Sequence, residues 1–489
     1  MNNTMKIRLL WAVPVLTLYA QTFRDPAPPV SATPVSVQSP VPRANPAVRL
    51  HAKPKPLPAG AATSDWVSFL GPSHNGISPE TRLLRNWPKD GPAIVWEMDK
   101  GTGYTSPAIS RDRLVYFHRQ GDREKVECLR AETGEKYWDF SYPTQFEDRY
   151  GYNNGPRSSP VIDGDYVYTY GAEGKLHCFS LQTGQVCWKR DLSAEFKVPQ
   201  DFFGTATTPL IEGELLIINI GAPRGPTVAA FNKLTGKMIW GAGSEWGASY
   251  ATPVAATVGD KRRVFVFAGG ESQPPSGGLI VLDPANGSID FKFPWRSRSY
   301  ESVNAASPVV AGNQVFISAS YRTGGALLNL LPNGTHTVAW TSQEIGTHFN
   351  TAIQKDGYLY AFDGRNEPDA ALVCVDLKTG KTMWRVTPEW DETFVVDGKT
   401  INQRLGTYRG TLLAVDGRFL CLGEMGHLLW LDLSPQGYKE LARTWLFAAR
   451  ETWSLPVLSR GLLYVSQHSR DVRNRKSSRL ICYDLRAAK

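Results

Sequence analysis

Short apolar runs separated by turn residues recur along the chain from Ala93 onward. The clearest example is Tyr166-Val167-Tyr168-Thr169-Tyr170, which follows the turn Asp163-Gly164 and alternates along its length. An alternation with a period of two indicates a β-strand with one buried face. The 44 glycines and 34 prolines suit many short strands joined by tight turns better than long helices. The pattern therefore predicts an all-β protein.

The strands belong to a repeating unit. One half of the unit is an apolar strand, a turn that ends in Thr-Gly or Asn-Gly, three residues and an aromatic residue. Its glycine and aromatic occur as Gly134 and Trp138, Gly184 and Trp188, Gly236 and Trp240, Gly287 and Phe291, Gly380 and Trp384. Two altered copies keep Trp340 and Trp445, and an eighth copy is divided between residues 480–485 and Trp96. We expect each aromatic ring to wedge against the neighbouring unit, burying roughly 200 Å².

The other half of the unit begins with Ser/Thr-Pro or a relic of it. This column reads Ser106, Ser159, Thr208, Thr252, Ser307, Ala352, Leu412 and Leu455. Each unit then holds four strands, and units packed radially bury the two faces that a single sheet would expose. The sequence therefore predicts an eight-bladed β-propeller over residues 93–489, with four-stranded antiparallel blades and a last blade closed by N- and C-terminal strands. Seven blades is the alternative, because the copies near 331–340 and 436–445 are degenerate.

The first 62 residues have a different character. Lys6 and Arg8 precede an apolar run at 9–19 and a cleavage position at Ala20, which predicts a secretory signal peptide at 1–20. The run is shorter than the roughly twenty residues of a membrane helix; an uncleaved anchor or a buried N-terminal helix are the alternatives. Residues 21–62 are rich in proline and predict a disordered or extended linker, and 63–92 an N-terminal strap. We therefore expect a periplasmic or secreted protein.

The net charge of +8 belongs mostly to this leader. Residues 1–62 hold seven basic side chains against one acid, Asp25, which leaves a net charge of +2 for the rest of the chain. A nucleic-acid-binding protein concentrates positive charge on its folded face. The distribution therefore argues against nucleic-acid binding.

One repeat carries a recognisable motif. Cys374, Asp376, Thr379, Gly380 and Trp384 resemble the tryptophan-docking motif of pyrroloquinoline-quinone-like (PQQ-like) propeller repeats. The resemblance covers nearly all of residues 66–489. Residues 66–72 are also similar to the segment that precedes the first repeat in many exported bacterial members of the family. It implies the propeller fold, but such repeats serve both quinone-dependent dehydrogenases and scaffold proteins of outer-membrane assembly. The chain lacks the adjacent cysteine pair and a clear calcium and carboxylate pattern of the enzymes, and the lipidated cysteine of the scaffolds.

The six cysteines invite a disulfide interpretation in an exported protein. Four of them share one repeat position with small apolar residues, which favours a packing role: Cys128, Cys178, Cys374 and Cys482. Only Cys178 and Cys187 face each other across a hairpin, so that bridge stays open as an alternative. No spacing of cysteines and histidines indicates a metal site.

The first strand of each propeller blade lines the channel, so the residues before the Ser/Thr column are expected to ring one mouth. Among the positions two and four residues before it, we select the large polar and aromatic side chains as ligand-binding candidates: Tyr104, Arg157, Tyr250, His348, Asn350, Tyr408, Glu451 and Trp453. The alternative is that Arg157 and Glu451 neutralise each other and the aromatic rings plug the channel.

Two classes of function remain open from the sequence. The first is a binding or scaffold protein that presents its channel mouth to a protein partner or a small molecule, as a monomer without a transmembrane span. The second, implied by the resemblance, is a PQQ-dependent oxidoreductase such as an alcohol or sugar dehydrogenase, with PQQ and calcium as cofactors. Glu451, Asn350 and His348 would then be its main polar contributors; another hydrolytic or lyase activity is the third possibility.

Overall fold

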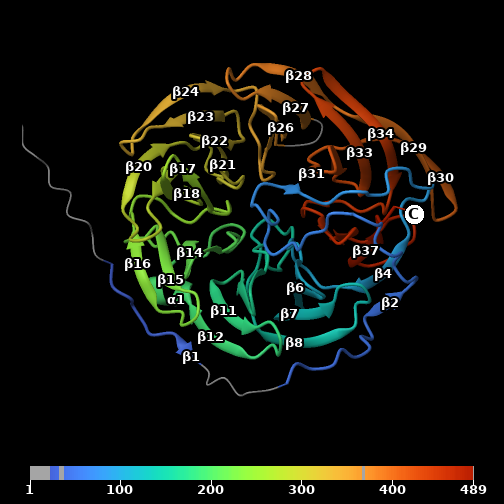
Figure 1. Ribbon diagram of the computed structural model, residues 1–489, viewed down its shortest axis with the longest axis horizontal. Helices are drawn as coiled ribbons and strands as arrows, with labels where there is room; N and C mark the ends of the chain where they lie inside the picture. Colours follow the sequence, from blue (N-terminus) through green and yellow to red (C-terminus); the bar gives the residue numbers. More distant parts are fainter. Residues whose placement is uncertain (1–22, 32–37, 366–368, 488–489) are drawn as a thin grey trace, which may run out of the picture.

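The computed structural model describes residues 23–31, 38–365 and 369–487. Within these residues, antiparallel four-stranded sheets form eight blades around a central channel, as Figure 1 shows. The predicted all-β fold with eight blades is confirmed. The described residues contain one short helix, α1 (Leu192–Phe196). The expected signal peptide at 1–20 lies outside the described residues.

The first four blades follow one another along the chain, each numbered from the channel outward. Blade 1 contains β5 (Ala108–Ser110), β6 (Arg113–Gln120), β7 (Arg123–Arg130) and β8 (Lys136–Pro143). Blade 2 contains β9 (Val161–Asp163), β10 (Tyr166–Tyr170), β11 (Lys175–Ser180) and β12 (Val186–Asp191). Blade 3 contains β13 (Leu210–Glu212), β14 (Leu215–Asn219), β15 (Val228–Asn232) and β16 (Met238–Ala242). Blade 4 contains β17 (Val254–Val258), β18 (Lys261–Ala268), β19 (Gly278–Leu282) and β20 (Ile289–Pro294).

The second half of the ring adds one hairpin and closes the circle. Blade 5 contains β21 (Val309–Ala311), β22 (Gln314–Ala319), β23 (Gly324–Leu330) and β24 (His336–Ser342). Blade 6 contains β25 (Ile353–Lys355), β26 (Tyr358–Asp363), β27 (Ala371–Asp376) and β28 (Thr382–Val386), and is followed by the hairpin β29 (Glu389–Val396) and β30 (Lys399–Gly406). Blade 7 contains β31 (Thr411–Val415), β32 (Arg418–Leu422), β33 (His427–Ser434) and β34 (Gly437–Trp445). Blade 8 contains β35 (Val457–Ser459), β36 (Leu462–Gln467), β37 (Arg479–Asp484) and the early strand β4 (Ile94–Asp99), as predicted.

The tryptophans of the repeat join neighbouring blades. The indole N–H of Trp138 in blade 1 donates to the carbonyl of Leu181 in blade 2 at 2.9 Å. Trp188 repeats this bond to Lys233 at 2.9 Å. The same bond is made by Trp96, Trp240, Trp340 and Trp384. Each of these six joints therefore combines a ring packed between blades, which the spacing predicted, with one hydrogen bond.

Blade 7 corrects one prediction. Trp445 does not occupy the docking position; its N–H donates to Met425 in its own blade at 2.8 Å. The strand register places Ala442 at the docking position, opposite Trp430 on β33. The connection from β33 to β34 is longer than in most blades, and the tryptophan that follows it, Trp445, lies three residues past the docking position.

The cysteine position is confirmed. In four blades the strand register pairs a cysteine with the docking tryptophan: Cys128 with Trp138, Cys178 with Trp188, Cys374 with Trp384, and Cys482 with Trp96. These four side chains are buried, and all six cysteines are free thiols. A small side chain here leaves room for the indole across the strand pair.

The proline-rich segment, predicted as a disordered or extended linker, is extended in its described parts and pairs with the blades. In Figure 1 it runs along the outside of the blades, where β1 (Val30–Ser31) extends blade 2 and β2 (Val48–Leu50) extends blade 8. Asp25 pairs with the buried Arg190 at 2.5 Å, and Arg49 pairs with Glu97 at 3.0 Å. Outer blade strands offer unpaired backbone groups, and an extended segment satisfies them.

The strap before β4 crosses the ring. Trp66 and Ile109 in blade 1 exchange two backbone hydrogen bonds, and β3 (Ile77–Ser78) pairs in parallel with the innermost strand of blade 7. Between these two anchor points, Phe69 and Leu70 reach the channel. The strap therefore supplies part of the wall of the cavity at the channel mouth.

Candidate functional site

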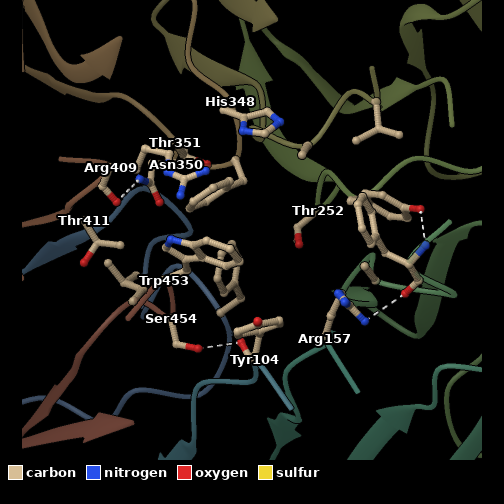
Figure 2. Close-up of a pocket in the computed structure, with 18 of the residues that line it drawn as sticks. Tyr104, Arg157, Thr252, His348, Asn350, Thr351, Arg409, Thr411, Trp453 and Ser454 are labelled. Carbon is tan, nitrogen blue, oxygen red and sulfur yellow. Dashed lines mark hydrogen bonds between the residues drawn. The ribbon is translucent and has the colours of Figure 1, made fainter. Parts of the chain in front are cut away.

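A cavity of about 270 Å³ lies at the channel mouth. Aromatic rings form most of its wall: Phe69, Tyr104, Tyr150, Tyr152, Phe203, Tyr250, Tyr321, Phe349 and Trp453. Six of the predicted residues line it, namely Tyr104, Arg157, Tyr250, His348, Asn350 and Trp453; Tyr408 and Glu451 do not. Figure 2 shows Arg157 and Arg409 on opposite sides of the cavity, with Tyr104 and Trp453 on the wall between them.

A ring of hydrogen bonds holds the rim in place. The backbone N–H of Ser106 donates to the hydroxyl of Ser159 in the next blade at 3.0 Å, and Ser159 repeats this to Thr208 at 3.2 Å. The chain of bonds continues through Thr252 and Ser307. Ser307 then donates to Thr351 at 3.0 Å. The Ser/Thr column is thus a belt between blades that fixes the residues before it.

This belt corrects the predicted rim in blades 6 and 7. Strand register places Thr351 and Thr411, not Ala352 and Leu412, at the column position. Neither threonine precedes a proline, so the sequence alignment slipped by one residue. A shift of one residue changes which side chains face the channel.

The corrected rim residues in these blades are Phe349 and Arg409, and both line the cavity. Sequence reasoning missed Arg409 and selected the preceding Tyr408 in its place. The sequence did contain a signal for Arg409. Thr351 and Thr411 keep the Ser/Thr column in blades 6 and 7, although neither is followed by a proline.

Arg157 is held by its own blade and not by Glu451. Its guanidinium pairs with the buried Asp148 at 2.5 Å and donates to the carbonyl of Phe203 at 3.1 Å. The same group lies 5.2 Å from the Phe203 ring and 5.3 Å from the Tyr104 ring. The proposed alternative of an Arg157–Glu451 pair is therefore replaced by an Arg157–Asp148 pair between aromatic faces.

Arg409 has a matching arrangement across the cavity. Its Nε donates to the buried Glu424 at 3.0 Å, and its guanidinium lies 4.9 Å from the Trp453 ring. Trp453 donates its indole N–H to the same Glu424 at 2.7 Å. The ring of Trp453 lies 5.4 Å from that of Phe349 and 5.8 Å from that of Tyr152. Glu424 thus fixes both the cation and the largest ring of the wall.

Glu451 stands behind the rim. It accepts the hydroxyl of Tyr104 at 2.6 Å, and burial together with this carboxylate holds the pKa of Tyr104 well above its usual range. Burial likewise raises the pKa of Tyr250, whose hydroxyl accepts the Phe203 amide at 3.0 Å. Both tyrosines stay neutral and present ring faces to the cavity.

His348 and Asn350 lie on the wall of blade 6. Burial, together with nearby Arg409 and Arg365, lowers the pKa of His348 to about 3, so its imidazole is neutral near pH 7. Its Nδ1 is buried without a hydrogen-bond partner among the described residues. Asn350 donates its amide to the carbonyl of Gly410 at 2.6 Å. The imidazole of His348 is therefore neutral, and its Nδ1 is enclosed within the protein.

A buried polar chain supports Tyr104 from behind. Lys100 approaches His468 Nδ1 at 3.3 Å, and His468 Nε2 lies 2.8 Å from the hydroxyl of Ser454. Ser454 in turn donates to the backbone carbonyl of Tyr104 at 2.6 Å. Burial lowers the pKa of Lys100 to about 7. Because the Ser454 proton is engaged by a carbonyl, this cluster positions the rim and does not present a nucleophile.

The described residues offer no group of three or more histidine, cysteine, aspartate or glutamate side chains placed to hold a metal ion. The same part of the chain contains no helix with the length and apolar character needed to cross a membrane.

Three solved structures share the propeller. The quinohemoprotein alcohol dehydrogenase from Comamonas testosteroni is 12% identical with a TM-score of 0.58, over 88% of this chain and 82% of that one. A europium-containing methanol dehydrogenase is 10% identical with a TM-score of 0.56, over 82% and 89%. BamB from Moraxella catarrhalis is 14% identical with a TM-score of 0.50, over 81% and 98%. At these identities the likeness shows the fold alone.

A search of curated proteins gave no significant match. By contrast, a family model described as outer membrane protein assembly factor BamB, of the PQQ-like repeat type, matches residues 122–386. This match covers more than half of the 489 residues and includes five of the six docking tryptophans, from Trp138 to Trp384. The chain therefore belongs to the family of PQQ-like repeat propellers described by the assembly factor BamB.

Proposed function

We propose that this protein is an exported binding protein whose channel mouth takes a small, uncharged ligand with flat faces and polar edges, such as a sugar ring. The observation that carries the proposal is the wall of the cavity. It combines aromatic faces with three guanidiniums: Arg157 and Arg409 are neutralised by Asp148 and Glu424, and Arg365 stacks on the ring of Tyr321 at 4.3 Å.

Aromatic faces and a few fixed polar groups are the usual composition of a small-molecule site. The face of a sugar ring that carries C–H groups packs on Trp453 or Tyr152, while its hydroxyls reach polar atoms on the rim. The cavity therefore matches a ligand that needs stacking and hydrogen bonds more than charge.

A quinone cofactor is the competing ligand. PQQ is an acidic quinone, and its use with calcium would require a cluster of metal-binding carboxylates, which the described residues do not form. Around this cavity Asp148 and Glu424 are bound to arginines, and Glu451 to Tyr104. The side chains of the described residues do not fit a calcium–quinone centre, and no redox step follows from them.

Export rests on the leader expected at residues 1–20 and on the resemblance to exported proteins. We expect the mature chain to begin near Gln21 outside the cytoplasm. Cell fractionation followed by N-terminal sequencing tests this, and an intact Met1 in the cytoplasm would contradict it.

Binding is tested by calorimetry on the purified full chain. We expect saturable binding of at least one neutral mono- or disaccharide, and none of PQQ with calcium. Replacing the half-exposed Tyr152 by Ala removes a stacking face next to Trp453 and weakens sugar binding by about 1 kcal/mol, roughly fivefold in Kd. The melting temperature should barely change, because this ring is 50% exposed.

The matched control is Leu234→Ala, which removes a side chain that is 43% exposed and does not line the cavity. It should leave sugar binding unchanged. Tight binding of PQQ with calcium together with reduction of an artificial dye would overturn the proposal in favour of an oxidoreductase. Failure of every sugar to bind the wild-type protein would overturn the ligand class.

A further inference from the structure

Two of the six cysteines lie next to each other in blade 2. In the strand pair of β11 and β12, Cys178 pairs with Trp188. The next pair is Phe179 with Val186, so a β-bulge leaves Cys187 as the additional residue of β12. A bulge places two consecutive residues opposite one residue of the partner strand, so Cys187 and Trp188 both face Cys178. Opposed residues have Cβ atoms about 4.5–5.5 Å apart and a disulfide spans roughly 3.5–4.5 Å, so a small shift at the bulge brings the two sulfurs into bonding range.

The same bulge in blade 1 shows where such a side chain points. There Tyr137 is the additional residue and Cys128 is the residue opposite. The guanidinium of Arg113 lies 3.8 Å from the centre of the Tyr137 ring, and its Nη1 lies 3.8 Å from Cys128 Sγ. The bulge residue and the residue opposite therefore turn to the same side of the blade, and in blade 2 both of them are cysteines.

The two thiols have different surroundings. Cys178 is fully buried, whereas Cys187 is half-buried and within reach of a small reagent. A hydrogen bond from Cys178 lowers the pKa of Cys187 to about 7, although burial acts in the opposite direction. Burial and the same contact raise the pKa of Cys178 well above its usual value. Cys187 is therefore the thiol that ionises, and Cys178 is the donor that stabilises its thiolate.

The other cysteines lack both properties. All of them are fully buried: Cys128, Cys374, Cys421 and Cys482. Burial raises the pKa of Cys128 to about 12 and that of Cys374 to about 11. In blade 6, which has the same bulge, the residue that faces Cys374 is Met383. Buried thiols with a raised pKa are inert, so we expect thiol chemistry in blade 2.

We propose that Cys187 and Cys178 form a dithiol pair that a small-molecule disulfide of the glutathione type oxidises to a bridge within blade 2. The Cys187 thiolate attacks one sulfur of the disulfide, which forms a mixed disulfide and releases the first thiolate. Cys178 gives its proton to this thiolate and attacks Cys187 Sγ, and the second thiol leaves with the proton that Cys187 had lost. Two electrons thus pass from the protein to the reagent. The pair lies in the outer part of blade 2, apart from the channel mouth, so the proposal does not depend on the ligand bound there (Figure 1).

The test is incubation of the reduced, purified full chain with glutathione disulfide, followed by non-reducing peptide mass spectrometry. We expect peptides linked through Cys178 and Cys187, while the buried cysteines of the other blades stay thiols. Cys178→Ala should fold, because Ala230 fills the same position in blade 3, and should stop at the mixed disulfide with one glutathione on Cys187. Cys374→Ala is the matched control: it removes a cysteine from the same repeat position and should form the bridge like the wild type.

The pH dependence of alkylation gives a second measurement. The rate at which iodoacetamide modifies Cys187 should rise with pH around a midpoint of about 7 in the wild type. In Cys178→Ala the midpoint should move to higher pH, because the hydrogen bond to the thiolate is lost. An unchanged midpoint, or no reaction at Cys187, would overturn the proposal. A glutathione adduct that persists on Cys187 of the wild type would also overturn it, because the two sulfurs then fail to meet.

Discussion

Two joints of the ring lack a tryptophan at the docking position, and the chain treats them differently. At the joint between blades 7 and 8, Ala442 stands there, but Trp430 on the neighbouring strand fills the space. Its N–H donates to the carbonyl of Leu84 in the strap at 3.0 Å, and Trp87 stacks on it at 6.1 Å. At the joint between blades 4 and 5, the ring of His336 packs on Phe291 at 4.1 Å, no indole is present at the docking position, and a cavity remains beside Phe291.

The difference shows what a joint requires. The requirement is a volume and one N–H donor directed at a backbone carbonyl of the next blade or, for Trp430, of the strap. The side chain can come from either strand of the pair. In blade 7 the large and small residues have exchanged strands, so the sum of their volumes is kept. In blade 4 Val281 keeps the small position and Phe291 is smaller than an indole, so volume and donor are both missing.

The largest effect should separate an intact joint from the incomplete one. Trp188→Ala removes a ring that is 1% exposed, together with its bond to Lys233, and should lower the free energy of unfolding by about 3–5 kcal/mol. Phe291→Ala enlarges an existing cavity at a half-buried site and should cost roughly half as much. Urea unfolding followed by circular dichroism measures both. If both variants lost the same free energy of unfolding, the two joints would contribute equally to stability.

A smaller effect tests the exchange in blade 7. Trp430→Ala leaves a cavity beside the strap, and Ala442→Trp forces a second indole against the first, so each single change destabilises the protein. Because the two residues face each other across β33 and β34, the double variant should recover about 1–3 kcal/mol relative to the sum of the single losses. A double-mutant cycle from urea midpoints provides the measurement. Additive losses would contradict the idea that the strands exchanged roles.

The sequence predicts features that are encoded by local spacing. The distance from Gly184 to Trp188 sets a turn and a ring within one hairpin, so the blades and most joints follow from it. The exchange in blade 7 escaped prediction because Trp445 is the tryptophan that follows the turn on β34, while Ala442 holds the docking position. Counting residues identifies a repeat only while the turn length is constant.

The channel mouth shows the second limit. Residues followed by proline marked the column correctly in blades 1 to 5, and the rim residues Tyr104, Arg157 and Tyr250 follow from it. Without proline the register in blades 6 and 7 was ambiguous by one residue, which hid Arg409. The path of the N-terminal segment depends on contacts between residues far apart in sequence, such as Asp25 with Arg190, and no local pattern carries them.

The smallest effect concerns the pH dependence of the incomplete joint. The ring of His336 on β24 lies 4.1 Å from that of Phe291, and partial burial lowers the pKa of His336 below its usual value. The folded protein therefore binds this proton less readily than the unfolded chain, whose histidines titrate near pH 6.5. It follows that the free energy of unfolding contributed by His336 falls as the pH drops through about 6.5.

His336→Phe removes this contribution and keeps a ring against Phe291. The variant should therefore gain melting temperature relative to the wild type on going from pH 8 to pH 5, by no more than about 2 °C. If the melting temperatures of the two proteins differ by the same amount at pH 8 and pH 5, burial at the joint does not change the pKa of His336. The cavity beside Phe291 would then admit water freely.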